Sequence, residues 1–195
     1  MKRMRFFSAA LLVSVLMLLA FSACSISQNK SDDGKDKVDI KTPFGSLKVD
    51  EGVDARDTGL PLYAGAKPYE KGENGHNAAN VNISSEFFGL KVVAAEYTTP
   101  DPPNKVRDFY QNALKSYGKV IECKGSYDNS VNVDKNDKHN DEPVNCSDVH
   151  GSNQDEIQLK VGTRNRQRVV GVKPDGGGTR FALVYVNTRG KESGS

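Results

Sequence analysis

The apolar residues of this chain recur with two different periods, and each period predicts a different element. Between residues 103 and 118 they recur every three or four positions, which is the period of one helix face. Asp101 precedes two prolines and fits a helix N-cap, and Gly118 fits the position after the last turn. We therefore predict a helix over residues 102–117, whose apolar stripe is Val106, Phe109, Tyr110, Ala113, Leu114 and Tyr117. We expect this stripe to pack on a sheet; the alternative is a ligand site lined by its aromatic rings.

Elsewhere the apolar residues alternate with polar ones or form short β-branched runs, which are typical of strands. Such runs lie at residues 38–41, 47–49, 79–84, 87–99, 119–123, 156–162, 168–173 and 181–187. The short links at 163–167 and 174–179 favour antiparallel hairpins. The last run is apolar on both faces, which is typical of a central strand. Strands before and after one helix predict the α+β class, an antiparallel sheet of about five to seven strands with one amphipathic helix packed on a face.

Two stretches show neither period. Residues 51–78 hold seven Gly or Pro and are predicted to form an extended strip over the core, with Leu60, Leu62 and Tyr63 packed inward. Residues 125–145 are rich in Asn, Asp and Lys, which predicts a solvated loop.

The N-terminus has the three parts of an export signal. Lys2, Arg3 and Arg5 are followed by residues 6–21, which are almost entirely apolar, and then by small residues before Cys24. The apolar stretch of about 16 residues is shorter than the roughly 20 that a membrane-spanning helix needs. The pattern therefore predicts a cleaved signal peptide.

The four residues Phe21, Ser22, Ala23 and Cys24 resemble the lipobox of bacterial lipoproteins, with Phe21 at the position where that family usually has Leu. The resemblance covers the first 24 residues. It implies a diacylglycerol on the Cys24 thiol, cleavage between Ala23 and Cys24, and acylation of the new amine, for example by palmitate. The alternative is an ordinary cleaved signal, or a spanning anchor, in which Cys24 is unmodified.

The resemblance also implies a location. Two or more acyl chains hold a protein durably on a bilayer. Ser25 follows Cys24, where an Asp is the usual retention signal for the inner membrane of double-membraned bacteria. We therefore expect a protein of the cell envelope that is anchored in the outer membrane and faces the periplasm.

The composition after Cys24 suggests how the chain is divided. Residues 25–37 contain one apolar residue and predict a flexible tether of roughly 20 Å. We predict a signal peptide at 1–23, a lipidated N-terminus with its tether at 24–37, a single α+β domain at 38–190 and a disordered tail at 191–195.

The charge of the mature chain argues against nucleic acid as a partner. Three of the 27 cations belong to the signal, so 24 cations face 25 acids from Cys24 onward, a net charge of −1. One basic cluster stands out in the last 40 residues. Its arginines are predicted to contact an anionic lipid or glycan surface, and the alternative is a solvated hairpin rim. They are Arg164, Arg166 and Arg168.

The cysteines left after lipidation of Cys24 are Cys123 and Cys146, which should pair in an oxidising compartment. Two other interpretations of this region were weighed. A zinc site would use Cys123, His139, Cys146 and His150, but their spacing is not that of a zinc finger. A calcium loop would use Asp134, Asn136 and Asp137, but the later ligand positions do not match. We expect no metal and no cofactor.

No catalytic motif is found in the sequence, and three classes of function remain. The favoured class is a non-catalytic binding or assembly module of the envelope, with an envelope protein, a lipid or a glycan as its partner. The second class is a carrier of a small ligand or lipid, which would need a deep apolar pocket under the helix. The third is an envelope enzyme, which would need a buried group with a shifted pKa in a cleft.

Overall fold

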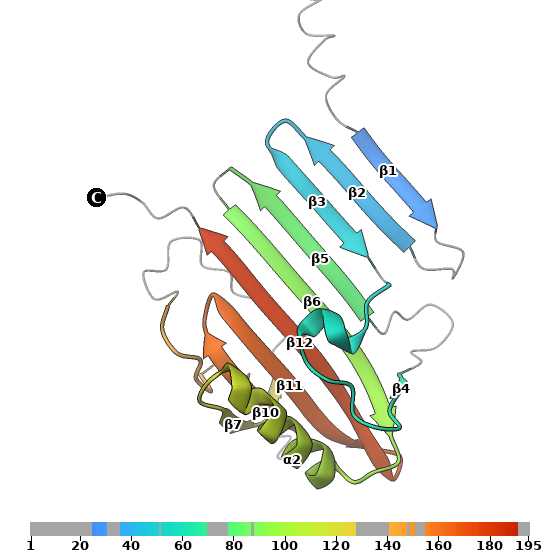
Figure 1. The fold of residues 1–195 in the computed structure, drawn as a ribbon, viewed down its shortest axis with the longest axis vertical. Coiled ribbons are helices and arrows are strands. Elements are labelled where there is room, and N and C mark those ends of the chain that lie inside the picture. The colour runs from blue at the N-terminus through green and yellow to red at the C-terminus, as the bar shows by residue number, and fades with distance from the viewer. Residues whose placement is uncertain are drawn as a thin grey trace, which may run out of the picture.

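The computed structural model describes residues 25–30, 36–50, 52–69, 78–86, 88–127, 141–147, 149–150 and 155–190. These residues form a ten-stranded antiparallel sheet with one α-helix packed on one face (Figure 1). The architecture confirms the predicted antiparallel sheet with a single helix. The predicted number of strands is too low, because the hairpin at residues 38–49 continues the main sheet and because two further segments pair with it.

The strands lie in the order β1-β2-β3-β5-β6-β12-β11-β10-β7, and β4 pairs with β6. Their bounds are β1 Ser25–Lys30, β2 Asp36–Thr42, β3 Gly45–Asp50, β4 Lys67–Pro68, β5 Ala78–Ser85, β6 Phe88–Thr99, β7 Ile121–Lys124, β10 Ile157–Thr163, β11 Arg166–Asp175 and β12 Gly178–Gly190. A separate pair is formed by β8 Ser126–Tyr127 and β9 Val149–His150. Strand β12 lies between β6 and β11, so the prediction that the last run is central is confirmed.

The predicted helix is present as α2, Pro103–Leu114, followed by the 3-10 helix η3, Lys115–Tyr117. Its stripe packs on the sheet, with Val106, Tyr110 and Leu114 fully buried. No helix in the described ranges is long and apolar enough to cross a membrane.

The predicted N-cap is wrong. Pro102 occupies the cap position, and no side chain caps the helix. The carboxylate of Asp101 instead accepts hydrogen bonds from the Tyr63 hydroxyl at 2.8 Å and from Lys105 Nζ at 3.0 Å. Pro103 at the first helical position has no N–H to be capped, which reduces the need for a side-chain acceptor there.

The core lies between α2 and the sheet and is closed by the strip that precedes β5. The Tyr110 hydroxyl donates to the Pro61 carbonyl and accepts from the Tyr63 N–H, both at 3.1 Å. The strip includes the 3-10 helix η2, Ala55–Thr58, which the sequence did not predict. Leu60 is buried and Tyr63 packs against the core, as predicted, but Leu62 is 44% exposed. The two hydrogen bonds to Tyr110 fix the backbone at residues 61 and 63, which turns the side chain between them outward.

Residues 25–30 differ from the prediction of a flexible tether, because they form the edge strand β1. It pairs with β2 from Ser25 opposite Lys41 to Lys30 opposite Asp36. The prediction rested on the lack of apolar side chains, but strand pairing needs only backbone donors and acceptors. Among the described residues, regular structure therefore begins at Ser25. The predicted signal peptide at 1–23, Cys24 and the predicted tail at 191–195 lie outside the described residues.

The structure contains the predicted Cys123–Cys146 disulfide, with a Cα–Cα distance of 5.5 Å. It joins the segment 141–147 to β7, and the buried Val144 of that segment bonds through its backbone N–H to Gly162. His139 of the alternative zinc site, and Asp134, Asn136 and Asp137 of the alternative calcium loop, lie outside the described residues.

A candidate interaction surface on the sheet

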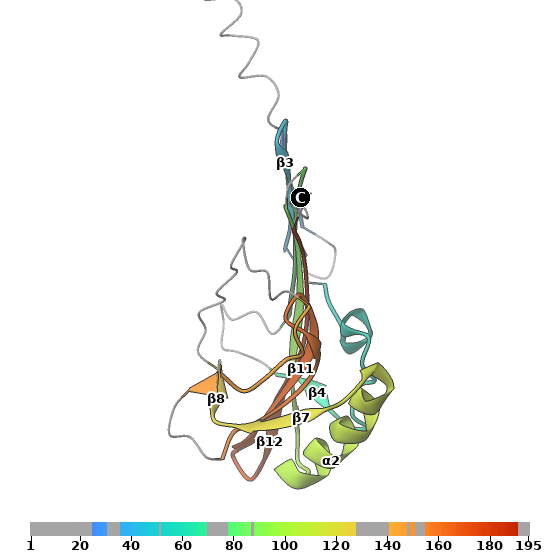
Figure 2. The same ribbon diagram turned by 90° about the vertical axis from the view of Figure 1, so that its left-hand side faces the viewer.

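The sheet has two halves that differ in what covers them. In the helix-covered half, α2 packs against β10, β11 and β12, and η2 packs against β6 and β12. The other half consists of β1, β2, β3 and β5 with the adjoining ends of β6, β12 and β11. Seen edge-on, the described residues of this second half form one layer of strands, whereas α2 and β8 lie on opposite sides of the first half (Figure 2). We call the second region the single-layer half.

One face of the single-layer half is apolar. Successive side chains of a strand point to opposite faces, so the strand register assigns each residue to a face. On β6, Ala95 and Tyr97 belong to the core under the helix, and Val92 and Ala94 therefore point to the other face. The register extends this face across the sheet in three rows. The first row is Ile26, Ile40, Leu47, Ile83 and Leu90; the second is Val38, Val49, Val81, Val92 and Val186; the third is Ala79, Ala94, Val184 and Val169.

These three rows, which we call the apolar face, consist of partly or fully exposed side chains that are absent from the core cluster. The rows contain no charged residue. Their lower border is marked by Glu96 and Arg180, whose side chains form an ion pair at 2.7 Å. The guanidinium of Arg180 also lies 3.8 Å from the centre of the Tyr69 ring.

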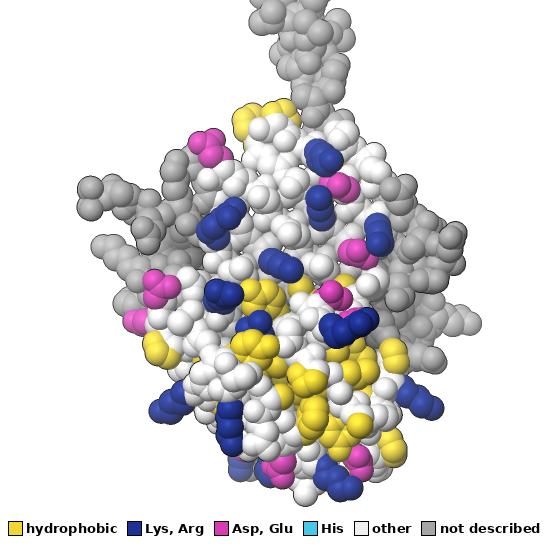
Figure 3. Space-filling model, viewed as in Figure 1, with side chains coloured by type: hydrophobic (Ala, Val, Ile, Leu, Met, Phe, Trp, Pro, Cys, Tyr) yellow, Lys and Arg dark blue, Asp and Glu magenta, His cyan; other side chains and the backbone are white. Residues whose placement is uncertain are grey.

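The opposite face of the same strands is polar. A row of Asp39, Lys48, Asn82, Lys91 and Asn187 crosses β2, β3, β5, β6 and β12. Lys37 pairs with Asp50 at 3.2 Å. Figure 3 shows this face, with charged side chains scattered over the single-layer half and apolar ones gathered near α2. The same strands therefore present polar and charged side chains on one face and apolar side chains on the other.

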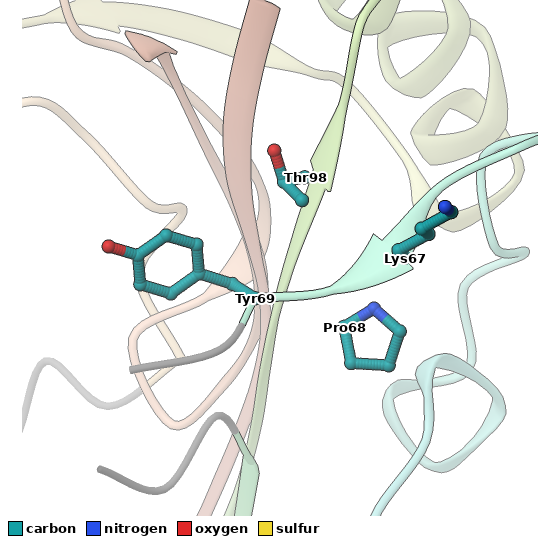
Figure 4. A pocket seen from close by; sticks show the side chains of 4 residues that line it. All are labelled: Lys67, Pro68, Tyr69 and Thr98. Atoms are coloured by element: carbon teal, nitrogen blue, oxygen red, sulfur yellow. The ribbon is translucent and has the colours of Figure 1, made fainter. Parts of the chain in front are cut away.

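A hollow of about 560 Å³ adjoins the lower border of the sheet and is lined by Lys67, Pro68, Tyr69 and Thr98. Figure 4 shows the Tyr69 and Lys67 side chains pointing away from one another. The hollow is open, and its polar groups do not converge on one point. It does not have the geometry of a binding site for a small molecule.

The three arginines of the predicted anionic contact lie in different surroundings. The Arg168 guanidinium stacks on the Tyr117 ring at 3.8 Å, and its Nε donates to the Thr58 carbonyl at 3.0 Å. Arg168 therefore ties η2 and η3 to β11, and its contact with an anionic surface stays a prediction. Arg166 is exposed and lines an open hollow of about 330 Å³ together with Arg168, and Arg164 lies in the β10–β11 turn.

The arginine contact explains why a glycine follows η2. Gly59 has a φ of +79°, and a Cβ added to it would lie 2.8 Å from the Arg168 guanidinium. The Gly59 carbonyl also accepts a hydrogen bond from the Tyr117 hydroxyl. Neither partner of Arg168 is near it in the sequence, and no sequence signal could have identified them.

The shifted titratable groups in the described residues are structural. Hydrogen bonds from Tyr63 and Lys105 lower the pKa of Asp101, and a hydrogen bond from Arg56 lowers the pKa of Asp54. Burial raises the pKa of Tyr110, which is fixed between the strip and the helix. Among the described residues, no group of three or more His, Cys, Asp and Glu side chains is arranged to hold a metal. In the alternative zinc site that was set aside on its spacing, Cys123 and Cys146 are joined in the disulfide.

The space under the helix is filled by side chains. The Tyr110 and Phe181 rings lie 5.5 Å apart, and Tyr97 stacks on Phe181 at 5.6 Å. Phe181, Leu183 and Val170 have at most 1% of their surface exposed. No protein-family model, curated protein or solved structure matches the chain. The apolar face is therefore the feature from which a function can be argued.

Proposed function

We propose that this protein is an exported, lipid-anchored module of the bacterial cell envelope that acts by assembly rather than catalysis. In this proposal the apolar face of one copy packs on the apolar face of a second copy. The main observation behind this proposal is that the face consists of three apolar rows. Each row is continuous over four or five strands of a single layer of sheet. A face of this kind is half of a β-sandwich, in which two sheets bury their apolar sides about 10 Å apart.

The sequence offers no apolar segment of the mature chain that is suited to the face. The residues after Cys24 that the structure does not describe are polar in sequence, apart from Phe87, Val131 and Val133. A polar segment would not compensate for the transfer of Val and Ile side chains from water. This composition favours another molecule as the partner.

Charge and shape favour a second copy as that molecule. The rows carry no charge that would repel an identical surface, and a two-fold axis places each row against its own symmetry mate. Rows about 7 Å apart on strands about 4.8 Å apart give a projected area of roughly 500 Å². That is as large as the largest apolar patch of a typical monomer, and somewhat below the roughly 800 Å² of accessible surface that each partner buries in a standard interface.

Membrane anchoring would strengthen such an interface. Two copies held in one bilayer by acylated Cys24 are confined to a thin layer, which raises their effective concentration. An interface that is weak between freely diffusing domains can then be well populated. The filled helix–sheet interface gives no support to the alternative of a small-ligand carrier.

Site-specific photo-crosslinking in living cells tests this proposal. A photoreactive amino acid replaces Val81 in the second row, and the matched control places it at the neighbouring Asn82, which lies on the opposite face of the same strand. We expect a covalent dimer from position 81 and much less from position 82. Crosslinks from position 81 to a different protein, or equal yields at both positions, would contradict self-assembly. Mass analysis of the N-terminal peptide of the same protein reports whether Cys24 is acylated.

A further inference from the structure

The most exposed large hydrophobic side chain in the described residues is Phe44, at 87%. It lies in the turn between β2 and β3, where Pro43 is exposed as well. The turn is held by its own hydrogen bonds: the Thr42 hydroxyl donates to the Gly45 carbonyl at 3.0 Å, and the Phe44 N–H donates to the Thr42 hydroxyl at 3.3 Å. The structure therefore presents this phenylalanine on a fixed loop at the end of a hairpin.

The chain enters the sheet at this same end. Ser25 is opposite Lys41, and the β2–β3 turn begins directly after Lys41 and Thr42. Figure 1 shows the start of β1 and the β2–β3 turn at one end of the sheet. Cys24 is joined to Ser25 by a single peptide link, about 3.8 Å between Cα atoms. The residue proposed to carry the lipid is thus covalently held near the Phe44 turn, without the tether expected from the sequence.

A second exposed apolar side chain lies at this end. Ile26 is 68% exposed and pairs with Ile40 on β2. Phe44 and Ile26 are the two most exposed large hydrophobic residues of the described chain. Lys41 and Lys48 flank the turn, with 65% and 58% of their side chains exposed, and both lie 3.9 Å from the Asp39 carboxylate. The end of the sheet therefore combines an aromatic ring, an aliphatic side chain and two exposed lysines.

We propose that the turn at residues 42–45 is a second membrane contact, in which Phe44 enters the bilayer interface next to the acyl chains of Cys24. This inference rests on the lipid anchor of the proposed function. Aromatic side chains favour the interface between headgroups and hydrocarbon, and lysines near it are attracted to anionic lipids. The two contacts together hold the sheet by its end, with the strands directed away from the membrane and the apolar face turned sideways.

The second contact matters for orientation more than for retention. Two or three acyl chains already bind durably, so the loss of one ring changes the bound fraction little. A single anchor lets the domain swivel, whereas two contacts restrict its tilt. An experiment on this inference must therefore report depth and orientation.

The chain contains no tryptophan, so one introduced tryptophan is a unique fluorescent reporter. The acylated Phe44→Trp protein is reconstituted into vesicles of phosphatidylcholine and phosphatidylglycerol, with and without brominated acyl chains. We expect a blue-shifted emission and loss of most of the intensity in the brominated vesicles. The matched control is Leu62→Trp, at an exposed hydrophobic residue of the strip in the helix-covered half, and it should lose little intensity.

The outcomes separate this inference from the proposed function. Mass analysis of the N-terminal peptide first establishes whether Cys24 is acylated. Acylated protein whose Phe44→Trp emission is not quenched would overturn the second contact and leave the anchor intact. Equal quenching of both variants would overturn the end-on orientation. An unmodified Cys24 on protein that does not float with the vesicles would overturn the anchor and the inference with it.

Discussion

The two halves of the sheet contain the same types of apolar residue, but these residues are buried in one half and partly exposed in the other. Val170 and Leu183 in the helix-covered half have no exposed surface, whereas Val81 and Ile83 in the single-layer half remain partly exposed. Strands β6 and β12 run through both halves, and their alternation continues from one to the other. The pattern of a strand thus says which side chains share a face, but not whether anything covers that face.

This difference in burial follows from the size of α2 relative to the sheet. The 12-residue helix α2 is about 18 Å long and about 10 Å across, enough for two or three strands. Nine strands side by side, as in this sheet, measure about 40 Å. In the part of the chain that the structure describes, one helix leaves more than half of such a sheet without a second layer. The function proposed above assigns the apolar face of the single-layer half to another molecule.

The largest expected effect lies under the helix. Tyr110→Ala removes a fully buried ring and its two hydrogen bonds, and should lower the free energy of unfolding by about 3–5 kcal/mol. Val81→Ala in the single-layer half should lower it by about 1 kcal/mol or less, because partly exposed residues leave no closed cavity. Urea denaturation of the monomeric domain measures both. Losses of similar size would mean that the two halves are packed alike.

A second, smaller effect tests how the strip is held to the helix-covered half. Arg168→Ala should cost about 2 kcal/mol, because it removes a charge-assisted hydrogen bond to Thr58 and a stack on Tyr117. Arg168→Lys should not restore the loss, since an ammonium group lacks the planar fork. Arg166→Ala, two residues along the strand and exposed, is the control and should change stability by about 0.5 kcal/mol or less. Equal melting temperatures of the two alanine variants in thermal unfolding would contradict a structural role of Arg168.

The smallest effect is a pH dependence confined to the helix-covered half. Hydrogen bonds from Tyr63 and Lys105 lower the pKa of Asp101 below its ordinary 3.8 in the folded protein. Its contribution to stability is therefore complete well above that value and is lost as the pH falls through the ordinary pKa toward the lowered one. Asp101→Asn should reduce the fall in melting temperature between about pH 6 and about pH 3, and Tyr63→Phe should reduce it in part. An unchanged acid sensitivity in both variants would contradict this account.

Local sequence patterns predicted much of the fold. The hairpin of residues 38–49 has the register that alternation implies, with Val38 opposite Val49, and the stripe of α2 is the buried one. The disulfide followed from the count of cysteines in a chain that is predicted to be exported. The hairpin and the helix are set by residues close together in the sequence, and the disulfide joins the two cysteines that remain when Cys24 is set aside.

The features that sequence did not predict depend on distant partners. Strand β1 pairs through backbone atoms, so its side chains give little sign of it. Arg168 contacts Thr58, 110 positions away, and such a pair has no local signal. The apolar face was visible as alternation, but its exposure depends on where α2 ends. The residues of the apolar face could thus be identified from the sequence, but their exposure on one common surface could not.

The pairing of β6 with β12, here called the seam, has a consequence for the order of folding. It joins residues 88–99 to residues 179–190 in the longest ladder of the sheet. On one side of it, β1, β2, β3, β5 and β6 pair with near neighbours in the chain, and on the other side β10, β11 and β12 do the same. Contacts between near neighbours form quickly, and contacts of high sequence separation form slowly. In the proposed export from the N-terminus, we expect the first meander to fold before the last strand has crossed the membrane, and the pairing of β12 with β6 to be the slow step of folding.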